Sequence, residues 1–95
     1  PAYDSGWVSI AKGEAKTLTH NLGGSADDYV VDLTFKSENA SYGINQLFFG
    51  GMYTSDPINH YGAYWRGLTP SSIVVSRQSD DVHADEIRVR IWVIK

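Results

Sequence analysis

The chain has 95 residues, a formal net charge of −3 and no cysteine. This length supports one domain with a single hydrophobic core, which we expect to span residues 1–95. The acidic balance argues against nucleic acid as a partner, because a nucleic-acid-binding surface needs a basic stripe. The lack of cysteine excludes a disulfide framework, and no apolar run approaches the ~20 residues that cross a bilayer, so we expect no membrane insertion.

Short runs with strand character alternate with turn residues along the whole chain, and no segment of useful length has the period of a helix. Seven or so short strands at this spacing are typical of an antiparallel sandwich or small barrel. We therefore predict an all-β fold, an antiparallel β-sandwich of six to seven short strands. The expected strand segments are residues 6–10, 16–22, 29–35, 47–49, 63–66, 72–77 and 85–95.

Two of these segments show which of their side chains should be buried. In residues 29–35, the side chains of Val31, Leu33 and Phe35 alternate with those of Val30, Asp32 and Thr34, and we expect the first set to face the core. The last segment alternates more cleanly than any other part of the chain. Its core-facing set is predicted to be Ile87, Val89, Ile91 and Val93.

The opposite face of the last segment is unusual, because it combines Arg88 and Arg90 with Trp92. Arginine and tryptophan are enriched where one chain meets another, so we predict a protomer interface here and a homo-oligomer. Asp32, on the outward side of residues 29–35, is an expected partner for one arginine. The alternative is a rim strand whose tryptophan is covered by a loop of its own chain.

The sequence contains no motif that indicates catalysis. The three histidines are isolated from the spacings that metal or nucleophilic chemistry needs, and we interpret His20 as a structural histidine at a strand end. The adjacent carboxylates Asp27–Asp28 and Asp80–Asp81 lack the spacing of a calcium loop and are interpreted as solvated turn acids. We therefore expect no enzyme activity, no cofactor and no metal site.

Polar and aromatic side chains gather in two parts of the chain in a mixture that suits sugars. Carboxylates and guanidinium groups bind sugar hydroxyls, and an aromatic ring covers the apolar sugar face. One group lies within residues 53–66 and includes Tyr64, although Tyr64 and Trp65 also fit packing within a strand. The other lies just before the last strand, where the alternative is a solvated connection. Its predicted ligand-binding residues are Arg77, Asp80, Asp81 and His83.

The order of these signals resembles the H-type lectins, the agglutinin-like modules of snail and slime-mould lectins that also occur in bacterial and phage adhesion proteins. The matching segments are 5–8 (Ser-Gly-Trp-Val), 29–33 (Tyr-Val-Val-Asp-Leu) and 87–93 (Ile-Arg-Val-Arg-Ile-Trp-Val). The resemblance implies an antiparallel sandwich that assembles as a trimer or double trimer. It also implies that a glycan of the galactose or N-acetylgalactosamine type binds between neighbouring protomers.

The sugar contacts that this resemblance implies fall on two parts of the chain. The loop before the last strand corresponds to residues 77–83, where only His83 carries a ring, whereas the family places a tryptophan and another aromatic residue there. An acidic loop residue corresponds to Asp28, or to Asp27 or Asp4. The family's basic residue on a middle strand has no counterpart, because residues 41–49 contain none.

Together these observations predict a non-catalytic carbohydrate-binding module that acts as a multivalent homo-oligomer, with its sugar site in loops near the protomer interface. The expected protein is soluble and suited to extracellular use or surface display, and the sequence leaves its compartment open. The alternative function is a structural or adhesion module, of the kind found at phage tails and adhesin tips, that binds protein rather than sugar.

Overall fold

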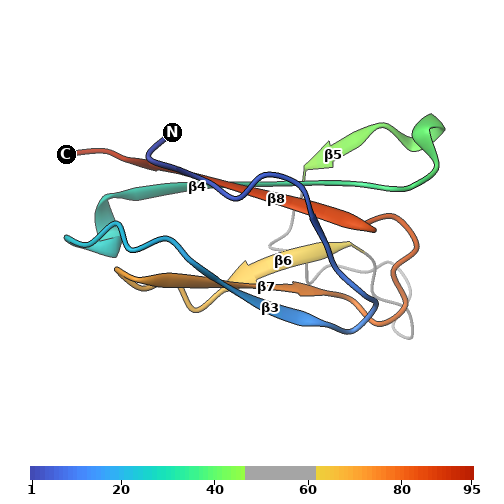
Figure 1. Cartoon of the computed structure of the whole chain (residues 1–95), viewed down its shortest axis with the longest axis horizontal. Helices are drawn as coiled ribbons and strands as arrows, with labels where there is room; N and C mark the ends of the chain where they lie inside the picture. Colours follow the sequence, from blue (N-terminus) through green and yellow to red (C-terminus); the bar gives the residue numbers. More distant parts are fainter. Residues whose placement is uncertain (47–61) are drawn as a thin grey trace.

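The computed structural model describes residues 1–46 and 62–95, which fold into two antiparallel β-sheets stacked as two layers (Figure 1). This confirms the predicted all-β class. The helical content of the described residues consists of two single-turn 3₁₀ segments, η1 (Ala26–Asp28) and η2 (Ala40–Tyr42). None of the helices there is long and apolar enough to span a membrane.

The larger sheet has five strands and is centred on β8 (Glu86–Val93). Its order is β1 (Tyr3–Asp4), β8, β4 (Tyr29–Lys36) and β5 (Ile44–Gln46), and β2 (Val8–Ser9) also pairs with β8. The smaller sheet has the order β3 (Ala15–Thr19), β7 (Ser72–Arg77) and β6 (Ala63–Arg66).

The core lies between the two sheets and is built from the alternating apolar residues of the long strands. Ile87, Val89 and Ile91 on β8 have no exposed surface, and neither do Ile73 and Val75 on β7. Because successive side chains of a strand point to opposite faces, this burial fixes the register of both sheets. The predicted alternation of β8 is confirmed at Ile87, Val89 and Ile91.

The structure differs from the predicted strands mainly at their ends. The described residues contain eight strands rather than six to seven, because β1 and β5 were not expected. Val93 was predicted to face the core but is 37% exposed, since it is the last residue of β8 and pairs with Tyr29 at the limit of the sheet. The expected strand at 47–49 lies outside the described residues, and so does most of the polar and aromatic group within residues 53–66.

The connections gather at two opposite ends of a molecule 38 Å long. Residues 10–14, 37–43 and 78–85 lie at one end, which we call the loop end (Figure 1). Residues 20–28 and 67–71 lie at the other end together with both termini, and we call it the terminal end. A sandwich of antiparallel strands enforces this separation, because each strand carries the chain from one end to the other.

His20 closes the terminal end of the core. Its Nδ1 accepts a hydrogen bond from the Leu22 N–H at 3.0 Å, so Nε2 carries the proton and donates to the Thr69 carbonyl at 2.9 Å. The ring is buried and meets the rings of Tyr3 and Tyr29 edge-on. Both ring nitrogens are therefore satisfied within the chain, which confirms the structural role predicted for His20.

Candidate functional site

The loop end is organised around a buried arginine at the end of β7. Arg77 points inward, as Ile73 and Val75 do four and two residues earlier, and its side chain is 5% exposed. Its Nε donates to Asp81 Oδ2 at 2.8 Å, and its Nη1 donates to the Ile10 carbonyl at 2.8 Å. The guanidinium thus joins the smaller sheet to the strand connection that leaves β2.

The carboxylate of Asp81 is fully buried and accepts hydrogen bonds on both oxygens. Oδ1 accepts from the Gly62 N–H at 2.7 Å, and Oδ2 accepts from the N–H groups of His83 and Ala84 at 3.1 and 2.7 Å. Burial alone raises the pKa of this carboxyl, but the backbone donors and Arg77 outweigh that effect and hold the pKa below its usual range. Asp81 is therefore a charged structural centre for the loop.

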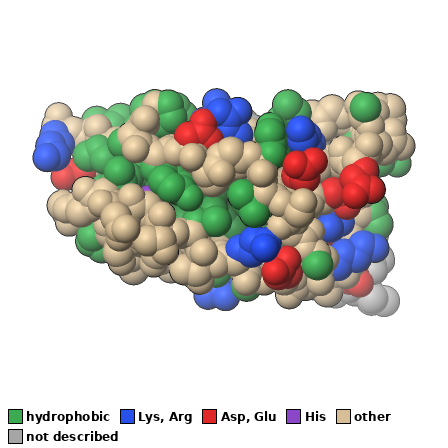
Figure 2. All heavy atoms as spheres, viewed as in Figure 1, with side chains coloured by type: hydrophobic (Ala, Val, Ile, Leu, Met, Phe, Trp, Pro, Cys, Tyr) green, Lys and Arg blue, Asp and Glu red, His purple; other side chains and the backbone are tan. Residues whose placement is uncertain are grey.

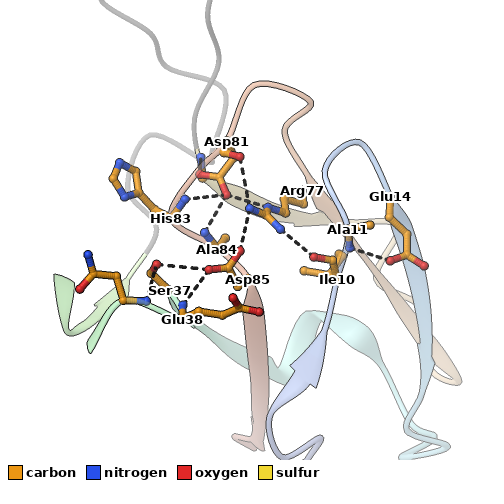
Figure 3. Close-up of polar contacts among 12 residues, drawn as sticks. Ile10, Ala11, Glu14, Ser37, Glu38, Arg77, Asp81, His83, Ala84 and Asp85 are labelled. Atoms are coloured by element: carbon orange, nitrogen blue, oxygen red, sulfur yellow. Dashed lines mark hydrogen bonds and ion pairs between the residues drawn. The ribbon is translucent and has the colours of Figure 1, made fainter. Parts of the chain in front are cut away.

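Asp85 links this centre to the connection after β4. Its Oδ2 accepts from the Glu38 N–H at 2.7 Å and from the Ser37 hydroxyl at 3.2 Å, while Oδ1 accepts from Arg77 Nη2 at 3.2 Å. The Glu38 N–H is the main reason that the pKa of Asp85 is lowered. We call Arg77, Asp81 and Asp85 the clasp (Figure 3), because together they hold both loops against the sandwich.

The two loops held by the clasp present a pair of aromatic rings at the surface. Tyr42 and His83 meet edge-to-face with ring centroids 5.0 Å apart, and Tyr42 is half-exposed. Asn39 positions the tyrosine, since its side-chain oxygen accepts from the Ser41 N–H at 3.1 Å and so caps η2. The ring of His83 points away from Asp81 and toward the outside of the loop (Figure 3).

Next to these rings in the chain are two further exposed side chains, Asp80 and Val82. Asp80 makes no hydrogen bond or ion pair within the described part of the chain, so its carboxylate is available to a ligand. Charged side chains are concentrated toward the loop end, whereas hydrophobic side chains run between the two layers toward the terminal end (Figure 2). The ring pair of Tyr42 and His83, with Asp80 three residues before His83 in the same loop, is the candidate functional site.

The structure separates the residues predicted to bind ligand. Arg77 and Asp81 are buried in the clasp and cannot reach a ligand at the surface, so their predicted role is corrected to a structural one. Asp28 is the last residue of η1 and belongs to the terminal end, opposite the loop end that contains His83. Tyr64 lies opposite Ser76 on the outward side of the smaller sheet. Within one chain, only Asp80 and His83 remain together on the surface of the loop end.

The residues predicted to form an interface do share one face, the side of the larger sheet that points away from the smaller sheet. Arg90 Nη2 lies 2.6 Å from Asp32 Oδ2, so the expected pairing of Asp32 with an arginine is confirmed within the chain. Arg88 pairs in the same way with Asp4. This bond lowers the pKa of the Asp4 carboxyl. Trp92 remains 37% exposed in the single chain.

Sequence reasoning missed Tyr42 because it was interpreted as part of a polar connection. A usable signal was present, since Asn39 is a favourable helix N-cap and fixes the short turn that ends in Tyr42. It also missed Val30 as an exposed neighbour of Trp92.

No protein-family model, curated protein or solved structure matches this chain. Within residues 1–46 and 62–95, no group of three or more histidine or carboxylate side chains is arranged to hold a metal ion.

Proposed function

We propose that this chain is a non-catalytic carbohydrate-binding module that works as a multivalent homo-oligomer. The observation that carries the proposal is the ring pair of half-exposed Tyr42 and partly buried His83, held by a buried ionic clasp. The same loop carries the exposed carboxylate of Asp80, which has no partner among the described residues. A half-exposed ring offers an apolar surface to the C–H face of a sugar, and a carboxylate accepts hydrogen bonds from its hydroxyls.

The rigidity of the loop end supports a binding role. A site whose side chains are held before the ligand arrives loses less conformational entropy on binding. The clasp orders both loops before a ligand binds. Asp81 accepts a hydrogen bond from the His83 N–H, and Asp85 accepts one from the Glu38 N–H in the connection that leads to Tyr42. A sugar such as galactose or N-acetylgalactosamine, which the resemblance to H-type lectins implies, fits a shallow surface of this kind.

The size of the site explains why the proposal includes several copies. One shallow sugar site binds with a Kd near 1 mM, about −4 kcal/mol. Linked copies raise the apparent affinity by ~10²–10⁴ without any new contact, provided that their geometry allows simultaneous binding.

The test is a glycan array followed by NMR titration of the ¹⁵N-labelled protein with galactose, N-acetylgalactosamine, glucose and mannose at about 10 mM, above the expected Kd. We expect backbone signals of residues 78–85 to shift with at least one sugar, and the shift to be lost in Tyr42→Ala. Tyr64→Ala is the matched control, because it removes another tyrosine on a different face.

An array without any signal, with binding instead to a protein partner, would overturn the proposal in favour of a structural or adhesion module. Sugar binding that survives unchanged in Tyr42→Ala would show that the site lies elsewhere.

A further inference from the structure

The outward face of the larger sheet has an ordered arrangement of side chains along β4 and β8. Three cross-strand pairs follow one another on this face, and their register is given by the ladder between the two strands. The pairs are Val30 with Trp92, Asp32 with Arg90, and Thr34 with Arg88.

The first pair is apolar and open to solvent. Val30 is 49% exposed and Trp92 is 37% exposed, and the two residues lie directly opposite each other at one end of the ladder. The guanidinium of Arg90 lies 5.8 Å from the centre of the Trp92 ring, so a charge flanks the indole. This arrangement leaves apolar surface exposed in the single chain and suits the centre of an interface, where aromatic residues and arginine are enriched.

The charges on this face alternate across the sheet. The two arginines lie on the central strand β8, with Asp4 on β1 to one side and Asp32 on β4 to the other. Acids and bases are equal in number among these four residues. An acidic partner would be attracted by the arginines of β8 but repelled by the aspartates of β1 and β4, and the reverse holds for a basic partner. A surface that carries the same alternating charges can place acids opposite the arginines and bases opposite the aspartates.

We propose that a second copy of the chain binds this face, related to the first by a two-fold axis that runs along the strands between β4 and β8. Such an axis places β8 of each copy over β4 of the other. Trp92 then faces Val30 of the partner subunit, and Arg90 faces Asp32 of the partner subunit. Each contact occurs twice, as in any isologous interface.

Two properties of sheets favour this geometry. Stacked sheets pack about 10 Å apart with their strands aligned within about 30°, which matches an axis parallel to the strands. The ladder of β4 and β8 also runs for eight residues without a break, which fixes the positions of the side chains along the face. Thr34 is buried, so the accessible part of the face is centred on the two pairs Val30–Trp92 and Asp32–Arg90. The inference is independent of the sugar site, because none of its residues lies in the candidate functional site.

Light scattering at about 100 µM, where an interface with a micromolar Kd is occupied, tests the assembly. The expected mass is twice the 10.5 kDa of one chain. Val30→Asp should halve this mass, because it introduces a charge at the exposed apolar pair, and circular dichroism should show an unchanged fold. Thr17→Asp, on the outward face of the smaller sheet, is the control and should keep the double mass. A wild-type mass of one chain or of three chains would overturn the proposal.

Cysteine cross-linking tests the contact directly, since the natural sequence contains no cysteine. A mixture of the single variants Val30→Cys and Trp92→Cys should form a heterodimer with a bismaleimide cross-linker whose spacer reaches about 10 Å, the separation of stacked sheets. Thr17→Cys mixed with Trp92→Cys should not. Equal cross-linking of the two mixtures would contradict the two-fold arrangement, even if the protein were dimeric.

Discussion

Adjacent aspartates in one loop have opposite roles in this protein. Asp80 is exposed and has no partner among the described residues, whereas Asp81 is fully buried with hydrogen bonds on both carboxylate oxygens. Sequence reasoning treated the pair as equivalent turn acids and ligand contacts, because a polar loop gives no sign of which carboxylate turns inward. The side chain that distinguishes them is Arg77, whose inward direction follows from the alternation of β7.

Asp81→Asn should therefore destabilise the protein by about 3 kcal/mol, because an amide nitrogen would replace an oxygen that accepts N–H donors and would leave Arg77 without its closest counter-charge. Thermal unfolding at pH 7 measures the loss. Asp80→Asn is the matched control and should unfold within about 0.5 kcal/mol of the wild type. Equal stability of the two variants would contradict the structural role of the clasp.

The same variant has an expected pH dependence. The pKa of Asp81 is lower in the folded protein than the ~3.9 of an unfolded aspartate, so its charge stabilises the fold fully above that value. This stabilisation is lost as the pH falls toward the folded pKa. The difference in unfolding temperature between the wild type and Asp81→Asn should therefore shrink below about pH 4.

At the scale of the elements, the long strands were predictable, whereas two of the short strands, β1 and β5, were not. Strands β4, β7 and β8 have six to eight residues, enough for alternation to show in the sequence. Strands β1 and β5 have only two and three residues, and they form because β8 and β4 offer them an edge. Such pairing depends on contacts far along the chain, which local patterns do not record.

The candidate site was predictable in part for a related reason. The loop before β8 was correctly expected to contain exposed polar residues and His83. Its aromatic neighbour Tyr42 comes from a connection 41 residues earlier, and only the antiparallel arrangement of β4 and β8 brings the two loops together. Asp28 was predicted to belong to the same site. It directly precedes β4, however, whereas Tyr42 lies in the connection that follows β4, so the two residues lie at opposite ends of the sandwich.

Strand β3 is an edge of the smaller sheet and carries a charged side chain of the kind that disfavours pairing with other chains. Lys16 lies opposite Val75, on the side of the strand that faces the other layer, where Glu14 is 3.5 Å away. A charged side chain that points inward at an edge makes it costly for another strand to cover that edge.

Lys16→Val should therefore promote association through β3, because the covering strand would no longer bury a charge. Light scattering of the double variant Lys16→Val/Val30→Asp, compared with Val30→Asp alone, isolates this effect from the outward face of the larger sheet. Lys12→Val, in the exposed turn between β2 and β3, is the control and should not change the mass. A monomeric double variant would show that the edge is protected by something other than Lys16.

At the scale of the whole molecule, the proposed two-fold axis has a consequence for binding. An axis along the strands leaves the direction of each strand unchanged, so the loop ends of both copies lie at the same end of the dimer. Two candidate sites would then face one glycan-bearing surface at once, as multivalent binding requires.

We expect a polymer carrying many copies of the bound sugar to bind the wild type ~10²-fold more tightly than the free monosaccharide does. Val30→Asp should lose this gain while keeping its monosaccharide affinity, because its substitution is remote from Tyr42 and His83. Surface plasmon resonance with the polymer and NMR titration with the monosaccharide measure the two quantities separately. A gain that persists in a monomeric variant would mean that the avidity has another origin.

The position of the termini adds a practical property. The first strand, β1, pairs with the last strand, β8, so that Tyr3 lies opposite Ile91. Both termini therefore lie at the terminal end of the sandwich, remote from the loop end (Figure 1). A bead, a dye or a longer polypeptide anchored through the first or last residue would therefore sit behind the module, and its recognition loops would point outward from the support.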